Sequence, residues 1–351
     1  MRAILECLLM KAAMALPMTP RTAILRDGKT LDPGFARLIA LREKMGLKDV
    51  DKMADKVGVE GVRRVYSEAL RAMSISLVPL GVERLKLTVP GGEGPRPARL
   101  YTPSHGRHGD GMLLFFHGGG FTIGDLDGFE PFTRRVAYLT RMPVLSVDYR
   151  LAPEHPFPAA SQDALAAAQA VVDDPGAFAP GCRRVALGGD SAGASLALGA
   201  AHGLLQTGRA AHALWLFNPA AAPGTDWPSM TTFGDGYILT KGMIDWFQRQ
   251  YLGKDGRHGE KAGSGPGAPP LDLTRLERLA DLPPCFLGVG GFDPLLDQNR
   301  ALATALRDAG VKLTYTEENG LIHDYVTFYQ ASRTALQALE RAAAWLRAQL
   351  A

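Results

Sequence analysis

The fold of this chain is decided by the stretch RVALGGDSAGASLALGAA, residues 184–201. Its first part reads as a short buried strand, and its last part is small and apolar and reads as a buried helix. Between them, Gly189 to Gly193 fits the pattern Gly-x-Ser-x-Gly, whose glycines allow a sharp turn and close packing. Such a turn would expose the hydroxyl of Ser191 at the positive end of the helix dipole. The pattern also occurs by chance in chains rich in Gly and Ala, so its function depends on partner residues.

Strands and helices are predicted to alternate through most of the chain. Residues 84–102 alternate around a Gly/Pro turn and predict a hairpin, and residues 33–75 show helical spacing. Short apolar runs predict strands at 112–116, 144–147, 185–187, 214–217, 285–289 and 313–315. Helices are predicted at 131–139, 159–172, 299–309 and 331–350. This rhythm predicts an α/β fold with a mostly parallel central sheet and helices on both faces.

The alternation breaks at residues 220–283, a gap too long for a single helical crossover. A helix is predicted at 241–251, followed by a Gly- and Pro-rich loop at 253–270. The segment is rich in aromatic residues: Trp227, Phe233, Tyr237, Trp246, Phe247 and Tyr251. Such an insertion can form a lid or a pocket wall. For most of these rings, simple packing of the helix onto the core is the preferred interpretation.

The composition is that of an ordinary globular protein and argues against nucleic acid or a structural metal as a partner. The 351 residues are 46% hydrophobic and 21% charged, with a formal net charge of +3. Lys and Arg are scattered, so nucleic-acid binding is not expected. Cys7, Cys182 and Cys285 lie far apart without a C-x-x-C pattern, which disfavours a structural metal and is typical of a reducing compartment. We therefore predict a cytoplasmic protein.

The N-terminal residues 1–16 are fairly apolar and faintly resemble a signal peptide. Glu6 and Lys11 interrupt the apolar run, and no small-x-small cleavage site follows it. The run is also too short to span a bilayer. We expect an amphipathic helix or a start extension, without stable membrane insertion.

A serine nucleophile needs backbone donors for the negative oxygen of its intermediate. The run FFHGGGF at 115–121 follows an apolar strand, and its glycines let N–H groups turn toward a ligand. Gly118, Gly119 and Ala192 are the predicted donors of this oxyanion hole. A flexible turn or a phosphate loop is the alternative, but the Gly-Lys-Ser/Thr ending of a phosphate loop does not follow. His117 lies too early to be the base and is expected to brace the loop.

The remaining partners follow the strands at 285–289 and 313–315. Asp293 is the predicted acid because the carboxyl end of a strand is where α/β sheets carry their chemistry, and Asp297 is the fallback. Asp293 also fits the N-cap of a helix that begins with a proline. His323 is the predicted base, taking the proton of Ser191 while Asp293 fixes its tautomer. The chain order Ser–Asp–His is the order found in α/β hydrolases.

These motifs together resemble the hormone-sensitive-lipase-like family of α/β-hydrolase esterases, also called bacterial family IV. The resemblance covers about residues 30–350. It rests on the segments His117–Gly120, Gly124–Asp127, Asp148–Ala159, Gly189–Gly193, Asp293–Leu295, His323 and, as a lid-helix element, Leu239–Lys241 before Trp246-Phe247. It implies an esterase for short to medium acyl chains that needs no cofactor, with a lid built from the N-terminal helices and the 220–270 insertion. The segment 148–158 would brace the glycine loop, with Arg150 and Glu154 as a buried ion pair.

The expected organisation is an N-terminal cap segment at 1–83, a hydrolase core in two parts at 84–219 and 284–351, and a cap insertion at 220–283. The sequence departs from the resemblance after the histidine, where Asp324-Tyr325 stands in place of Gly-Phe. A carboxylate there is expected to raise the pKa of His323.

The leading functional prediction is a serine ester hydrolase acting on a small-molecule ester. A non-catalytic small-molecule receptor on the same fold, and an amidase or peptidase with the same triad, remain alternatives. A homodimer is possible. Acyl length, alcohol preference, stereopreference and physiological substrate are left open.

Overall fold

The computed structural model describes residues 25–44, 49–74, 81–104, 106–224, 226–253 and 271–351. Expectations for residues 1–16, Cys7 and most of the loop at 253–270 lie outside these ranges. The strands are β1 Leu25–Arg26, β2 Lys29–Thr30, β3 Val82–Gly91, β4 Gly94–Pro103, β5 Gly111–Phe116, β6 Val144–Val147, β7 Arg184–Asp190, β8 Ala213–Phe217, β9 Cys285–Phe292 and β10 Leu313–Ile322. The α-helices are α2 Pro33–Lys44, α3 Val50–Ser74, α4 Glu130–Thr140, α5 Ala159–Asp173, α6 Pro175–Phe178, α7 Ala192–Gln206, α8 Pro228–Phe233, α9 Lys241–Leu252, α11 Leu296–Asp308 and α12 Arg333–Gln349. Short 3₁₀ turns are η2 Leu273–Arg275, η3 Leu279–Asp281 and η4 Tyr329–Ala331.

An eight-stranded sheet with the order β10-β9-β8-β7-β5-β6-β4-β3 forms the centre of the molecule. The six strands from β10 to β6 are parallel to one another, and the connections between them contain helices. The hairpin of β3 and β4 adds two antiparallel strands at one edge. The α/β fold with a mostly parallel sheet is therefore confirmed.

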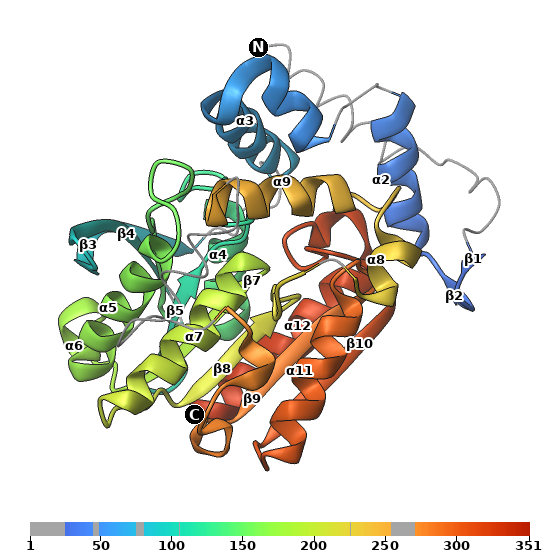
Figure 1. Cartoon of the computed structure of the whole chain (residues 1–351). Coiled ribbons are helices and arrows are strands. Elements are labelled where there is room, and N and C mark those ends of the chain that lie inside the picture. Colours follow the sequence, from blue (N-terminus) through green and yellow to red (C-terminus); the bar gives the residue numbers. More distant parts are fainter. Residues whose placement is uncertain (1–24, 45–48, 75–80, 105, 225, 254–270) are drawn as a thin grey trace.

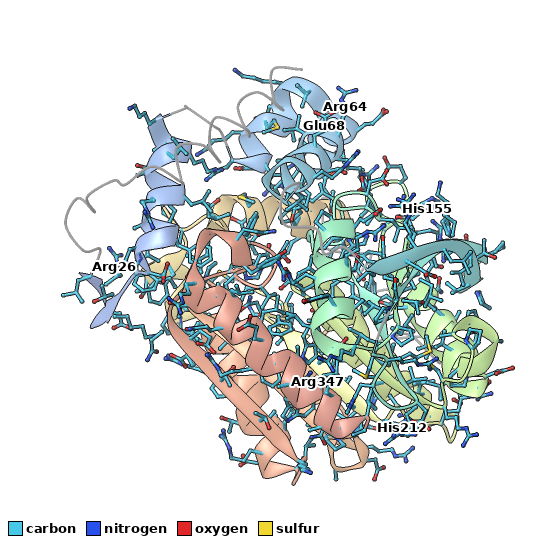
Figure 2. All side chains as sticks on the ribbon, turned by 180° about the vertical axis from the view of Figure 1, so that it is seen from behind. Arg26, Arg64, Glu68, His155, His212 and Arg347 are labelled. Carbon is cyan, nitrogen blue, oxygen red and sulfur yellow. The ribbon has the colours of Figure 1, made fainter. Side chains whose placement is uncertain are left out.

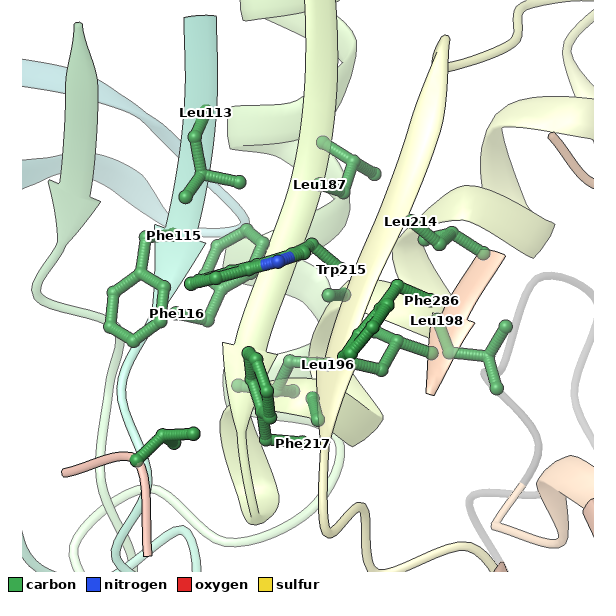
Figure 3. Packing of buried hydrophobic residues seen from close by; sticks show 14 of the residues in the cluster. Leu113, Phe115, Phe116, Leu187, Leu196, Leu198, Leu214, Trp215, Phe217 and Phe286 are labelled. Atoms are coloured by element: carbon green, nitrogen blue, oxygen red, sulfur yellow. The ribbon is translucent and has the colours of Figure 1, made fainter. Parts of the chain in front are cut away.

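Helices cover both faces of this sheet, as Figure 1 shows. The elements α5, α7 and α11 pack on one face, and α4 and α12 pack on the other. The core between these layers is apolar because the central strands are buried on both sides. Figure 3 shows Phe115 and Phe116 of β5, Leu187 of β7, Trp215 of β8 and Leu196 of α7 interdigitating there.

Two helical segments lie over the carboxyl ends of the strands. In Figure 1, α3 and α9 cross above the sheet on the side where β7 and β9 end. Val62 of α3 and Trp246 of α9 share a small apolar cluster with Ile123 of the glycine loop. The segment expected to be helical, residues 33–75, contains the helices α2 and α3, and α3 is kinked at Gly58, which has a φ of 68°. Residues 271–281 lie instead beside α7 and α11.

Candidate active site

The turn between β7 and α7 places Ser191 at its tip. Ser191 has a φ of 53°, in the left-handed region, and its amide N–H donates to the carbonyl of Phe217 on β8 at 2.8 Å. A Cβ at Gly193 would overlap the backbone carbonyl of Phe116 on β5. The turn is therefore held between two strands, and only glycine fits at 193.

His323 and Asp293 meet this serine. Nε2 of His323 lies 2.9 Å from Oγ of Ser191, and its Nδ1 lies 2.8 Å from Oδ2 of Asp293. Asp293 is fully buried and His323 is 2% exposed. Oδ1 of Asp293 accepts from the amide of Leu295 at 2.8 Å, so the same carboxylate also organises the turn into α11. Both sequence interpretations of Asp293, the acid and the helix-start residue, fit this geometry.

Asp297, the fallback acid, makes different contacts. Its Oδ2 accepts from the amide of Ser229 at 2.8 Å, and its Oδ1 lies 3.0 Å from Nη1 of Arg300. The bond to Ser229 joins α11 to α8, whereas the pair with Arg300 lies within α11, so Asp297 has a structural role.

The glycine loop after β5 approaches the serine closely. A Cβ at Gly118 would lie 3.0 Å from the carbonyl of Asp190 and 3.4 Å from Cβ of Ser191. Gly119 has a φ of 114° and Gly120 one of 57°. Among the described residues, the amide N–H groups of Gly119 and Gly120 have no acceptor. Both glycines line the cavity at the serine together with Ala192, whereas Gly118 does not.

His117 braces this loop, as the sequence predicts. Its imidazole stacks on the rings of Tyr149 and Phe129, with centroids 4.4 and 5.2 Å apart. Its Nδ1 lies 2.8 Å from the carbonyl of Gly118, and the hydroxyl of Tyr149 donates to the His117 carbonyl at 2.8 Å. Burial lowers the pKa of His117, so it is a neutral packing residue at physiological pH.

The prediction of an ion pair between Arg150 and Glu154 is wrong, because each residue has another partner. Arg150 is 5% exposed and pairs with the fully buried carboxylate of Asp163 at 2.9 Å. Its Nη1 also lies 2.6 Å from the exposed Glu93. Glu154 is half exposed and pairs with Arg63 of α3 at 2.6 Å. Asp163 stands one turn inside α5, and its carboxylate also accepts from the backbone amide of Arg150 at 2.9 Å.

Arg63 ties the helical layer to the glycine loop. Its Nε donates to the carbonyl of Thr122 at 2.8 Å, and its Nη2 donates to the carbonyl of Ala152 at 2.7 Å. The amide of Ala152 in turn donates to the carbonyl of Phe121 at 2.9 Å. Arg63 is not among the residues predicted from the sequence. Its two partners lie 59 and 89 residues further along the chain, and the residues around a single arginine on an amphipathic helix do not reveal such distant contacts.

Two further carboxyls surround His323. Oδ1 of Asp324 lies 3.2 Å from Nε2 of His323, the nitrogen that faces the serine. Burial lowers the pKa of His323, but the charges of Asp293 and Asp324 outweigh it and raise that pKa to about 10. Asp190 is fully buried, and burial together with the charge of Asp324 raises its pKa well above the ordinary value. Thr327 donates to Asp190 at 2.7 Å.

A cavity of about 120 Å³ opens at the serine and is largely apolar. The cavity is lined by Ser191 and His323. Phe247 and Tyr251 of α9 and Tyr66 of α3 also line it. Packing onto the core was the preferred interpretation for most of the cap aromatics, and it holds for Phe233 and Tyr237, which contact Phe292 of β9. Phe247 and Tyr251 instead form the cavity wall.

The described residues contain no group of three or more His, Cys, Asp or Glu side chains able to hold a metal ion. Cys182 and Cys285 are buried free thiols. Within the described ranges, no helix is long and apolar enough to span a membrane. Figure 2 shows Arg26, Arg64 and Arg347 well apart on different elements, consistent with a scattered positive charge.

The sheet order and the serine turn define the class of an α/β hydrolase, and comparisons with known proteins agree. The family model described as the alpha/beta hydrolase fold matches residues 113–327. The carboxylic ester hydrolase LipN of Mycobacterium tuberculosis is 36% identical over 88% of this chain and 80% of its own length. The esterase LipI of the same organism is 34% identical over 86% of this chain and 93% of its own length.

Solved structures give the same result. An esterase from Pyrobaculum calidifontis superposes with a TM-score of 0.76 and 31% identity, covering 89% of this chain and 99% of that chain. A thermostable esterase from Pseudomonas putida superposes with a TM-score of 0.80 and 26% identity, covering 92% and 98%. The chain belongs to the α/β-hydrolase fold family, in its hormone-sensitive-lipase-like branch.

Proposed function

We propose that this protein is a serine carboxylic-ester hydrolase. The observation that carries the proposal is the continuous chain of contacts from Ser191 through His323 to Asp293, at 2.9 and 2.8 Å. In this role His323 takes the proton of Ser191, Ser191 attacks the ester carbonyl, and the same imidazole then protonates the leaving alcohol. Water releases the acyl-enzyme in the second half of the reaction.

The oxyanion of the tetrahedral intermediate needs donors with no other partner. We propose the amide N–H groups of Gly119, Gly120 and Ala192, each of which lines the cavity. Gly120 takes the place of Gly118 in this proposal, because Gly118 does not line the cavity. Removal of one such donor costs roughly 2.7–4 kcal/mol of the barrier. Gly119 and Ala192 are the donors that the sequence also predicts.

The cap is proposed to comprise the N-terminal segment at 1–83 and the insertion at 220–283, and the core to comprise 84–219 and 284–351. Helices α3 and α9 support this division because they cover the serine cavity. Within the insertion, the turns η2 and η3 pack beside α11, and η2 also contacts α7. Such a cap would exclude water and select short to medium acyl chains in a cavity of about 120 Å³.

Replacement of Ser191 by Ala tests the assignment. The variant should lose hydrolysis of p-nitrophenyl butyrate while its circular dichroism and melting temperature stay near those of the parent. Retained hydrolysis would exclude Ser191 as the nucleophile. A burst of p-nitrophenol in the parent separates an enzyme from a receptor on the same fold, which would bind without turnover. The matching p-nitroanilide distinguishes an esterase from an amidase.

The free buried thiols of Cys182 and Cys285 support a cytoplasmic location. A homodimer through an edge strand is a further proposal, for which β3 and β10 are the edge strands of the sheet. Light scattering of the purified protein gives the assembly directly.

A further inference from the structure

Two cavities share one wall of aromatic rings. The first, at the serine, measures about 120 Å³, and the second measures about 520 Å³ and runs along α5 and α7. Residues that line both are Phe121, Ala220, Ala222, Gln248 and Tyr251. The larger space therefore begins directly behind the wall of the smaller one.

The two rings of this wall are fixed from several directions. Phe121 and Tyr251 stack with centroids 4.0 Å apart and planes 8° apart. Phe157 meets the Tyr251 ring edge-on at 5.5 Å, and its amide donates to the Tyr251 carbonyl at 2.9 Å. The Tyr251 hydroxyl lies 3.3 Å from Oγ of Ser161. Because Tyr251 is only 5% exposed and held by these contacts, the wall is a fixed partition.

The direction of the second cavity identifies the part of the substrate that would meet the wall. This step rests on the proposed ester hydrolysis, in which His323 protonates the leaving alcohol and the glycine loop holds the carbonyl oxygen. The alcohol group therefore lies beside His323, and the acyl chain takes the remaining direction. His323 and Asp324 line only the first cavity, whereas the second is lined by residues between 121 and 277. The second cavity therefore lies away from the alcohol group, in the direction left for the acyl chain.

The larger cavity suits an alkyl chain next to the wall. Its apolar lining includes Leu165 of α5, Leu196 of α7 and Leu252 and Leu271 at its cap side. Polar side chains such as His202 and Glu277 also line it. An acyl chain that passed the wall would find an apolar surface along α7.

We propose that the Phe121–Tyr251 pair determines acyl-chain specificity. The stacked rings stop the acyl chain at the end of the small cavity, and the larger cavity behind them accepts a longer chain once a ring is removed. Short acyl esters are then the preferred substrates of the unmodified protein.

Replacement of Tyr251 by Ala tests this proposal. The measured quantity is the ratio of kcat/KM for p-nitrophenyl decanoate to that for p-nitrophenyl acetate, because a ratio is independent of the fraction of folded enzyme. We expect the ratio to rise about tenfold or more. Tyr251→Phe keeps the ring and should keep the ratio. Tyr237→Ala is the matched control, since Tyr237 is a buried cap tyrosine that meets the Phe233 ring edge-on and lines neither of the two cavities.

A second substitution tests whether the chain enters the larger cavity. Gly199 of α7 lines that cavity, and a Cβ there meets nothing within 4 Å. Adding Gly199→Leu to Tyr251→Ala should fill the space and return the ratio toward the parent value. Gly199→Leu alone should leave the ratio unchanged, because the wall already stops the chain.

Three results would overturn the proposal: an unchanged ratio in Tyr251→Ala, a raised ratio that Gly199→Leu does not reverse, or a lowered ratio in Gly199→Leu alone. A change confined to a series of alkyl acetates would place the alcohol at the wall and also overturn it. Each variant is paired with its Ser191→Ala form. Ser191-dependent turnover with an unchanged ratio rejects the wall alone, whereas Ser191-independent turnover rejects the proposed function.

Discussion

Oδ1 of Asp324 lies 3.2 Å from Nε2 of His323, the ring nitrogen that must accept the serine proton. Asp293 holds the other ring nitrogen, so the imidazole stands between two carboxylates. The charge of Asp190 also raises the pKa of His323. Burial and the charges of Asp324 and Asp190 raise the pKa of the nearby Tyr66. His323, with its pKa raised to about 10, is therefore stabilised in the protonated form.

Replacement of Asp324 by Asn should lower the pH at which the enzyme becomes active. A protonated His323 cannot act as a base, so a raised pKa moves the acid limb of the kcat/KM profile toward alkaline pH. Without the Asp324 charge, the limb should shift to lower pH by roughly 1–3 units. Asn tolerates the φ of 56° at this position. A pH–rate profile that keeps its acid limb in the variant would contradict this role.

Asp190→Asn should improve stability at alkaline pH. In the folded chain Asp190 holds a proton because its pKa is well above the ordinary value, whereas the unfolded chain releases that proton above about pH 4. This difference makes the fold less stable as the pH rises from there toward the folded pKa. The asparagine removes the difference and keeps an oxygen for Thr327. Melting temperatures from pH 4 to pH 9 should diverge in favour of the variant, and parallel curves would refute the assignment.

Two glycines of α7 should respond in opposite ways to alanine. Gly193→Ala places a methyl group on the carbonyl of Phe116 and should abolish activity and lower the melting temperature. At Gly199 the added methyl meets open space, and the loss of backbone freedom in the unfolded chain should stabilise the protein by about 0.5–1 kcal/mol. Urea unfolding measures both, and equal effects at the two sites would argue against the packing of the serine turn described above.

Arg63 should affect turnover more than its ion-pair partner. Arg63→Met removes the donors to the carbonyls of Thr122 and Ala152 and should lower kcat/KM by loosening the glycine loop. Glu154→Gln is the matched control, because this half-exposed pair contributes about 0–1 kcal/mol at most. If the two variants lose activity equally, the salt bridge, rather than the carbonyl contacts, is the important feature of Arg63.

The sequence predicted most of the core because its signals are local. The strands β5 to β9 are short apolar runs, and the Gly-x-Ser-x-Gly turn is encoded within five residues. The last strand extends to Ile322, beyond the predicted residues 313–315. The prediction was short because β10 is a half-buried edge strand, and Glu317 and Glu318, which pair with arginines, interrupt its apolar run.

The parts that were missed depend on distant contacts. The pair of Arg150 with Glu154 was expected from the family resemblance, but Arg150 pairs with the fully buried Asp163 on α5. The proposal of Gly120 in place of Gly118 rests on which glycines line the cavity, and the local sequence does not show this. The wall consists of Phe121 and Tyr251, which lie on two segments far apart in the sequence. Neither segment contains a motif that predicts contact with the other.

The nucleophile and its base lie 132 residues apart. The serine turn is held by β5 and β8, which are complete once residue 217 has been synthesised. His323 arrives only after β10 has joined the edge of the sheet. During synthesis, the serine turn would therefore lack its base until the last part of the chain has docked. The last part of the chain also supplies cavity-lining residues such as Leu295 and Phe328, so turnover is expected only once the chain is complete.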